Sequence, residues 1–505
     1  DAVFSLTLDP TTTGGKVTFT LLGNLDHSVD TNPGTQDELT LNFGYTATDS
    51  DGDSVNGSFT VDVKDDVPLI PFGSENVSID EDGPIWNPGA GLPGSNPGGV
   101  DDNIIASKSA TGLLGILWGA DNANPTSAGG EGDRSVAFRG IESGTAVRYG
   151  DGIALTSNGA PVYFYLLNGQ TLVGSTSAVA PTSVGDGSVV FTVTLNDAGG
   201  LAGTGSYTFT LVKPLDHPEG ANENNINLNF GFTATDGDGD QVNGSFSVNL
   251  DDDTPEQGNY VSDRSVDEDG INGNAGAPTG YPTSGSDADL AGEAVSVSSS
   301  LKIYWGADNN TRGESASDDF GREVNFVRAN GSSNSATPLN EGVVSASDLG
   351  LPSTLKSDGV ALAYQIVKTM TGEGGSWNGG YQLIAYKAGT DYMAAANKVF
   401  TVTLDPTSQN GSYTFDLLGN LDHSKANAED NIKLDFGFRA TDADGDTASR
   451  GTFTISVDDD APVAGPVVSL SLVDEDDLSG GNDLFKESRT TSSDLGILWG
   501  SDNAK

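Results

Sequence analysis

Three acidic loops of the pattern D-x-D-G-D carry the residues of this chain that point most clearly to chemistry. Each loop places three carboxylates within five residues, and such like charges repel one another unless a cation holds them together. Carboxylate oxygens are the hard ligands that Ca²⁺ prefers, and the glycine permits the positive φ that a tight turn can require. The predicted calcium ligands of these loops are Asp49, Asp51 and Asp53; Asp236, Asp238 and Asp240; and Asp442, Asp444 and Asp446.

These loops differ from EF-hands in two respects. Glycine is the fourth residue of each loop, whereas an EF-hand has it sixth. The twelfth residues are Thr60, Ser247 and Phe453, where an EF-hand has a bidentate Glu. A solvated acidic turn is the alternative for any single copy, but three copies at matched positions favour a metal site.

A second acidic set surrounds the boundary between repeats. DDxP closes one repeat, DED opens the next, and GxDN follows further on. The proline of DDxP and the first Asp of DED are separated by the same distance in all three copies, unlike a flexible linker of variable length. We therefore predict calcium shared across the boundary, with DED as a simple strand cap as the alternative. The predicted ligands are Asp65, Asp66, Asp80, Asp82, Asp121, Asp252, Asp253, Asp267, Asp269, Asp308, Asp459, Asp460, Asp474, Asp476 and Asp502.

The three histidines of the chain all lie in an LDH turn, at His27, His217 and His423. One histidine per repeat does not make a usual zinc site, so a hydrogen-bonding role is favoured. No G-x-S-x-G nucleophile elbow occurs, and a catalytic carboxylate pair is rarely repeated along a chain. We predict no catalytic residue and no cofactor except Ca²⁺. Weaker candidate ligands near the turn are Asp26, Asp216, Asp422, Asp37, Asn224 and Asp430.

Internal repetition organises these motifs. The LDH turns lie 190 and 206 residues apart, and the other motifs recur in the same order. The sequence predicts a C-terminal half of a repeat at 1–69, complete repeats at 70–256 and 257–463, and an N-terminal half at 464–505. The chain starts and stops within repeats, which we interpret as a slice of a longer protein. The alternative is that the two halves complete one another between molecules.

Period-two alternation predicts strands throughout the chain. Val190–Leu195 and Val399–Leu404 alternate apolar and polar residues, and Asn168-Gly169 between two apolar runs predicts a hairpin. Short strands punctuated by Gly, Asp, Asn and Pro are typical of β-sandwiches. We expect an all-β chain of tandem immunoglobulin-like or cadherin-like sandwiches with calcium-bound junctions.

Composition restricts the partners. The 72 acidic and 23 basic residues give a formal charge of −49, which excludes nucleic acid and argues against anionic membranes. The 35% of hydrophobic residues indicates a folded chain rather than a disordered one. The sequence has no cysteine, no signal peptide and no stretch that approaches the roughly 20 apolar residues of a membrane-spanning helix.

The order LDH, LxFGFxATDxDGD and DDxP, followed by DED and LWGxDN, resembles the tandem repeats of type I-secreted RTX adhesins and is similar to VCBS and cadherin-like bacterial repeats. The resemblance covers essentially the whole chain. It implies calcium-rigidified β-sandwiches in a long fibre, secreted unfolded to the bacterial cell surface, with a role in cell adhesion and biofilm formation. The partners it implies are neighbouring repeats of the same chain, with any surface receptor bound elsewhere.

The leading hypothesis is thus a structural extender of a giant bacterial adhesin. The first alternative is a self-assembling extracellular filament or surface layer built from identical subunits. The second is a carbohydrate-binding module that uses the aromatic residues of the longer repeat, although alternating strand cores explain these residues better. They are Tyr364, Trp377, Tyr381, Tyr386 and Tyr392.

Overall fold

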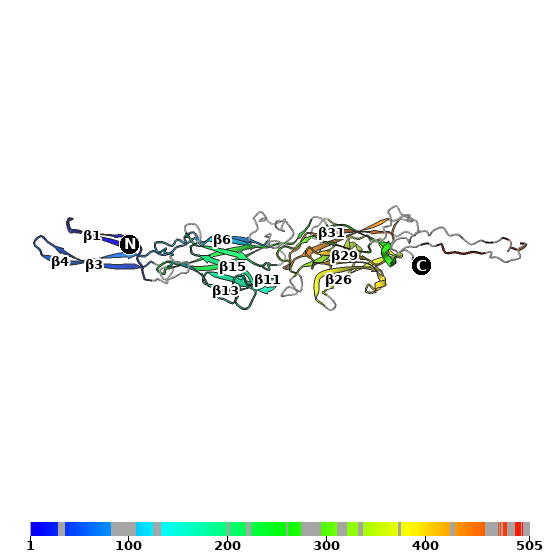
Figure 1. Cartoon of the computed structure of the whole chain (residues 1–505), viewed down its shortest axis with the longest axis horizontal. Coiled ribbons are helices and arrows are strands. Elements are labelled where there is room, and N and C mark those ends of the chain that lie inside the picture. The colour runs from blue at the N-terminus through cyan, green and yellow to red at the C-terminus, as the bar shows by residue number, and fades with distance from the viewer. Residues whose placement is uncertain are drawn as a thin grey trace. The chain divides into compact units, whose positions relative to one another are not determined.

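The computed structural model describes residues 2–28, 36–81, 108–124, 133–198, 203–218, 224–258, 261–273, 294–310, 321–331, 337–371, 375–424 and 430–459, and a few residues beyond these: 473, 475, 478–481, 490–495 and 497. The chain forms two compact units that divide between Asp253 and Thr254. Almost every regular element in the described residues is a strand (Figure 1).

The described residues between 2 and 69 form two antiparallel hairpins. β1 (Phe4–Asp9) pairs with β2 (Lys16–Leu21), and β3 (Glu38–Thr48) pairs with β4 (Ser54–Lys64). The long β3–β4 ribbon carries the first acidic loop at its turn. This half-repeat contributes two two-stranded sheets to the first unit.

The rest of the first unit is a sandwich of two sheets. A six-stranded sheet has the order β6-β16-β15-β14-β13-β8, and a four-stranded sheet has the order β5-β18-β17-β7. Short ladders flank them. The bounds are β5 (Val77–Asp80), β6 (Ser109–Leu113), β7 (Ser135–Arg139), β8 (Thr145–Ala146), β9 (Arg148–Tyr149), β10 (Ile153–Ala154), β11 (Thr156–Ser157), β12 (Ala160–Pro161), β13 (Tyr163–Asn168), β14 (Thr171–Ser175), β15 (Val189–Asn196), β16 (Ser206–Leu211), β17 (Asn225–Thr235) and β18 (Gln241–Asp251).

The second unit repeats this architecture with a larger sheet. A seven-stranded sheet contains β21-β29-β28-β27-β26-β24 with β25 beside β26, and a four-stranded sheet has the order β20-β31-β30-β23. The bounds are β19 (Glu256–Gln257), β20 (Arg264–Asp267), η2 (Glu268–Gly273), β21 (Ser296–Ser300), β22 (Ile303–Tyr304), β23 (Glu323–Val327), β24 (Gly342–Val344), α1 (Ala346–Leu349), β25 (Lys356–Ser357), β26 (Val360–Met370), β27 (Trp377–Lys387), η3 (Ala395–Asn397), β28 (Lys398–Asp405), β29 (Ser412–Leu417), β30 (Asn431–Thr441) and β31 (Gly451–Asp458).

The predicted all-β sandwich fold is confirmed. The alternating runs at 190–195 and 399–404 lie in β15 and β28, and Asn168-Gly169 lies at the turn between β13 and β14. The aromatic residues of the longer repeat belong largely to its core, since Tyr364, Tyr381 and Tyr386 are each less than a tenth exposed. Within the described residues, no helix is long and apolar enough to cross a membrane.

A column of four phenylalanines forms the centre of each sandwich. In the first unit, ring centroids lie 5.3 Å apart for Phe191–Phe209, 6.3 Å for Phe209–Phe230 and 5.4 Å for Phe230–Phe246. The second unit repeats the column with separations of 5.3, 6.2 and 5.4 Å. Such offset pairs add to the burial of apolar area, so the column is a main source of stability.

Truncating this column tests how much of the stability it provides. We expect Phe230→Ala to lower the free energy of unfolding of the first unit by about 3–5 kcal/mol, because Phe230 is 1% exposed. Phe43→Ala, at the matching position of the half-repeat, is the control and should have less than half that effect, because Phe43 is only half-buried. Urea unfolding followed by tryptophan fluorescence measures both. Equal effects would contradict the assignment of the core.

Candidate calcium sites

The first aspartate of each D-x-D-G-D loop builds the turn. In the second copy, Asp236 Oδ1 accepts hydrogen bonds from the backbone N–H groups of Gly239 at 3.2 Å and Asp240 at 2.8 Å. The glycine has φ +114°, a conformation that other residues rarely adopt. The other two copies make the same pair of hydrogen bonds. The loop is therefore shaped by its own backbone, and Asp236 Oδ2 takes no part in these bonds.

The loop of the complete repeat in the first unit meets the half-repeat that precedes it. Asp238 Oδ2 accepts the backbone N–H of His27 at 3.2 Å. The backbone N–H of Gly237 donates to the carbonyl of Asp121 at 2.7 Å. One carboxylate oxygen from each of Asp65, Asp121 and Asp238 lies within 4.8 Å of the others. Residues of DDxP, GxDN and D-x-D-G-D thus converge on one point.

Hydrogen bonds from neighbouring residues hold these carboxylates in place. Asp66 Oδ2 accepts the N–H of Ala120 at 2.7 Å, and Asn24 Nδ2 donates to Asp121 Oδ1. Gly119 has φ +77°, and a Cβ there would lie 2.4 Å from Asp66 Oδ2, so only glycine allows the close approach. The GxDN loop is held in turn by Trp118, whose Nε1 donates to the carbonyl of Gly203 at 2.8 Å.

Two of the converging carboxylates are buried, Asp65 at 5% exposed and Asp121 at 3%, while Asp238 is half-buried. Asp236 of the same loop is 1% exposed. Burial, and then the contact with Asp240, raises the pKa of Asp65 to about 7. Burial, and then Asp238, raises the pKa of Asp236 to about 8. Burial also raises the pKa of Asp121, with the charges of Asp238, Asp26 and Asp66 adding to the effect.

This set of oxygens fits a hard divalent cation. The buried atoms Asp65 Oδ2, Asp236 Oδ2 and Asp238 Oδ1 meet no hydrogen-bond donor among the described residues. Buried carboxylate oxygens that lack a donor are strongly unfavourable. In the part of the chain that the structure describes, the only basic side chain near Asp65 is His27, whose Nε2 lies 4.0 Å from Asp65 Oδ1, and no Lys or Arg forms an ion pair with these carboxylates. A cation with six to eight oxygen ligands, such as Ca²⁺, would satisfy them.

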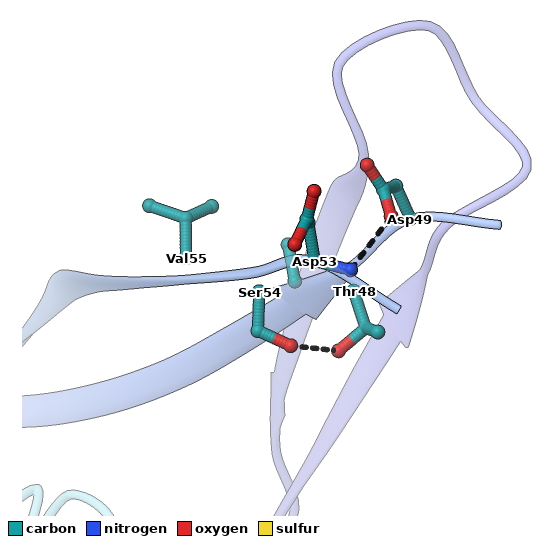
Figure 2. A pocket seen from close by; sticks show the side chains of 6 residues that line it. Thr48, Asp49, Asp53, Ser54 and Val55 are labelled. Carbon is teal, nitrogen blue, oxygen red and sulfur yellow. Dashed lines mark hydrogen bonds between the residues drawn. The ribbon is translucent and has the colours of Figure 1, made fainter. Parts of the chain in front are cut away.

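The first acidic loop provides a contrast. Asp49, Asp51 and Asp53 are exposed at the tip of β3–β4. Figure 2 shows the Asp49 side chain turned back onto the backbone N–H of Asp53, beside the 2.8 Å contact between the hydroxyls of Thr48 and Ser54. The contact with Asp51, followed by backbone N–H groups, lowers the pKa of Asp49. The hollow beside the loop is open, with a volume of about 360 Å³.

The third loop is buried like the second. Asp442 is 2% exposed, Asp444 7% and Asp446 2%, and Asp308 of the GxDN motif is 1% exposed. The backbone N–H of Ala443 donates to the carbonyl of Asp308 at 2.9 Å, which reproduces the Gly237–Asp121 bond of the first unit. GxDN and D-x-D-G-D therefore meet in both complete repeats.

The DED aspartates do not lie beside the DDxP aspartates of the preceding repeat, although the two motifs are close in sequence. Asp80 ends β5, which pairs in parallel with β18, so Asp80 lies beside Asp251 rather than beside Asp65 and Asp66. Asp267 likewise ends β20, beside Asp458 of β31. The β17–β18 ribbon carries its acidic turn at one end and Asp251 at the other, so about 30 Å of strand separates Asp80 from Asp238. DED and DDxP of consecutive repeats do not converge at this junction.

The middle residue of DED, which was not among the predicted ligands, is fully buried in both complete repeats. Glu81 is fully buried, accepts the N–H of Leu215 and lies 3.6 Å from His217 Nε2. Glu268 is also fully buried and accepts the N–H of Leu421 at 2.7 Å. A glutamate stands between the two aspartates in all three copies of DED, and this repetition could have indicated its role. Asp82, Asp460, Asp474, Asp476 and Asp502, and the side chain of Asp269, lie outside the described residues.

His217 and His423 lie at the end of each complete repeat that is opposite its D-x-D-G-D loop. Both make hydrogen bonds there, in agreement with the predicted role. His217 Nδ1 contacts the carbonyl of Asn224 at 3.0 Å and lies 3.8 Å from Asp252 Oδ2. His423 lies between Glu268 and the aspartates Asp430 and Asp459. Burial lowers the pKa of His423, but Glu268 and Asp459 outweigh it and raise that pKa to about 9.

Two further aspartates of this end, Asp216 and Asp422, accept hydrogen bonds from backbone N–H groups. Asp216 accepts the N–H groups of Asn158 and Gly159, and Asp422 accepts that of Gly359. Asp253, next to Asp252, is 1% exposed. Asp37 contacts His27 Nδ1 at 2.8 Å. Asp216 and Asp422 thus fix the turn around each histidine.

One family model and several solved structures are similar to this chain. A family model described as a domain of unknown function, DUF5801, matches residues 99–249. No curated protein matches the chain. Among solved structures, mouse clustered protocadherin PcdhgC3 EC1-3 is similar at 13% identity and TM-score 0.18, covering 84% of this chain and 77% of its own. The CupB6 tip adhesin from Pseudomonas aeruginosa is similar at 11% identity and TM-score 0.19, covering 69% and 88%.

Proposed function

We propose that this chain is a load-carrying extender of a bacterial surface adhesin, built of β-sandwich repeats that calcium joins at their boundaries. The protein is secreted by the type I route, acts at the cell surface in adhesion and biofilm formation, and has no enzymatic activity. In the first unit, the boundary ion is held by Asp65 of the half-repeat together with Asp121 and Asp238 of the repeat that follows.

One observation carries the proposal. Asp65 belongs to the half-repeat, Asp121 and Asp238 belong to the repeat that follows, and their oxygens lie within 4.8 Å of one another in buried surroundings. An ion at this point would connect two successive repeats. Without it, carboxylates of both repeats repel one another across the same boundary. Binding to the folded form alone stabilises that form by mass action.

Calorimetric titration of the calcium-stripped chain with Ca²⁺ tests the proposal. We expect Asp238→Asn to weaken one class of sites by roughly tenfold or more, because it removes a charged ligand from a buried site. Asp51→Asn changes the same position of the exposed loop and serves as the matched control, with little effect on the tight sites. Absence of any heat of binding, or identical curves for the two variants, would overturn the proposal.

The carbohydrate-binding alternative has less support. Tyr364, Tyr381 and Tyr386 are buried, and Trp377 packs partly buried against the core with Lys368 Nζ 4.2 Å from its ring centroid. Sugar stacking needs an open aromatic face. We therefore propose no glycan-binding role for this segment.

A further inference from the structure

His423 lies in a cluster of metal-ligating side chains that three distant segments of the second unit bring together. Glu268 begins η2, His423 belongs to the LDH turn, and Asp459 follows β31. One ligand atom from each of these residues lies within 4.8 Å of the others. The side chains of Glu268, His423 and Asp459 are 0%, 2% and 9% exposed. The cluster is therefore almost completely buried.

A carboxylate fixes the orientation of the imidazole ring. His423 Nδ1 lies 2.9 Å from Asp430 Oδ1, which is a hydrogen-bond distance. Because an ionised carboxylate can only accept, Nδ1 carries the hydrogen and Nε2 of the neutral ring keeps its lone pair. Histidines that bind metals usually donate their other ring N–H to a carboxylate or a backbone carbonyl in this way. Asp430 therefore prepares Nε2 to act as a ligand.

The Nε2 atom faces Glu268 across a gap. Among the described residues Nε2 makes no hydrogen bond, and it lies 3.5 Å from Glu268 Oε1. An N–H···O hydrogen bond is shorter, at about 2.7–3.2 Å. Two ligands of one tetrahedral zinc ion, each with a bond of about 2.0–2.2 Å, lie roughly 3.4 Å apart. The separation thus fits a metal ion better than a shared proton.

The charge of the cluster also favours a divalent cation. Glu268, Asp430 and Asp459 bring three carboxylates around one imidazole. In the metal-free chain a proton on the ring offsets one of these charges, in line with the raised pKa of His423. A divalent cation bound to the neutral ring offsets two. Buried carboxylates whose charge is not offset are unfavourable, so the ion stabilises the cluster more than the proton does.

The first unit contains the same arrangement. His217 Nδ1 contacts the backbone carbonyl of Asn224 at 3.0 Å, and His217 Nε2 lies 3.6 Å from Glu81 Oε1. Asp252 Oδ2 lies 3.8 Å from His217 Nδ1, close to the 4.0 Å between Asp459 Oδ2 and the ring of the second unit. The separation between the glutamate and Nε2 is therefore kept in both complete repeats.

We propose that each complete repeat binds one Zn²⁺ ion at this cluster, in the second unit through His423 Nε2, Glu268 and Asp459. One imidazole nitrogen with carboxylate oxygens suits Zn²⁺, whereas Ca²⁺ takes oxygen ligands. Three protein ligands leave the fourth position of the ion to water. The ion connects the residue after β20, the LDH turn and the end of β31, so it ties the start of a repeat to its end.

The zinc site of the first unit uses other residues than the boundary calcium site. Glu81, His217 and Asp252 form the former, whereas the latter consists of Asp65, Asp121 and Asp238. Zinc binding therefore does not rest on the proposed function. A chain that binds calcium without zinc, or zinc without calcium, decides the two proposals separately.

Calorimetric titration of the full chain with ZnCl₂, in buffer that is already saturated with Ca²⁺, tests the proposal. The wild-type chain should bind one Zn²⁺ ion in each complete repeat. Glu268→Gln should weaken the site of the second unit by roughly tenfold or more, because it removes a charged ligand. The amide oxygen can still accept the N–H of Leu421, so the fold is kept. Glu341→Gln, at an exposed position of the same unit, is the matched control and should bind zinc like the wild type.

Cobalt provides a second readout that weak binding to surface carboxylates does not give. Co²⁺ in place of Zn²⁺ should produce the intense visible absorption of a tetrahedral site, and His423→Gln should remove about half of it. This variant also serves if Glu268→Gln does not fold. Absence of zinc binding in the presence of calcium would overturn the proposal and leave an imidazolium ion pair. Equal zinc affinity of Glu268→Gln and Glu341→Gln, or a cobalt spectrum that His423→Gln leaves unchanged, would overturn it as well.

Discussion

Removal of calcium with EDTA is expected to lower the unfolding midpoint of the first unit by roughly 5–10 °C for the site at Asp65, Asp121 and Asp238. A ligand at a hundredfold excess over its dissociation constant adds about 2.7 kcal/mol to the folded state. For a domain of this size each kcal/mol moves the midpoint by roughly 2–4 °C. Differential scanning calorimetry of the calcium-saturated and chelated chain measures the shift.

Two controls make this result specific. Magnesium at the same concentration should restore less of the midpoint, because Mg²⁺ dehydrates reluctantly and requires a smaller octahedral site. Asp238→Asn should lose most of the calcium-dependent shift of the first unit, while Asp51→Asn keeps it. A midpoint that EDTA leaves unchanged would contradict the calcium sites altogether.

Neutralising Asp65 is expected to have opposite effects with and without calcium. Without calcium, Asp65 is a buried carboxylate whose pKa is raised to about 7, so its ionised form destabilises the folded chain. Asp65→Asn should then raise the midpoint by about 2–4 °C near pH 8. With calcium, the same substitution removes a ligand and should lower the midpoint. A change of the same sign in both conditions would argue against Asp65 as a ligand.

The pH dependence of the calcium-free chain has a defined sign. The usual aspartate pKa is 3.8, and the folded values of Asp65 and Asp236 are about 7 and about 8. Between these limits the folded chain holds protons that the unfolded chain has released, so stability falls as pH rises. The loss should level off about one pH unit above the folded pKa of Asp236, near pH 9. Saturating calcium should flatten the dependence, because the ion requires the ionised carboxylates.

The strands could be predicted because their pattern is local. Alternation in the runs at 190–195 and 399–404 depends on residues two apart, and the structure places both runs in central strands. The three acidic loops were identified by their own residues. Gly239 has the positive φ that the prediction required, and Asp236 folds the turn through hydrogen bonds within five residues.

The partners of these loops could not be predicted, because they are distant in sequence. His27 and Asp238 are 211 residues apart, and Asn24 and Asp121 are 97 apart. DED was assigned to the boundary because it follows DDxP closely in sequence. Parallel pairing with β18 instead carries Asp80 to the far end of its own repeat. The number of residues between the DDxP proline and the first Asp of DED is the same in all three copies. The pairing of β5, which ends at Asp80, nevertheless determines where Asp80 lies.

The parallel pairing of β5 with β18 has a mechanical consequence. β5 is the first strand of its repeat and β18 is the last, and four residue pairs hold them side by side in the same direction. A force that pulls the two ends of the repeat apart therefore draws these strands past each other along their length. All the hydrogen bonds between them resist together, whereas a hairpin pulled open from one end loses its bonds one after another. The β20–β31 pair has the same arrangement, so each complete repeat resists tension in shear.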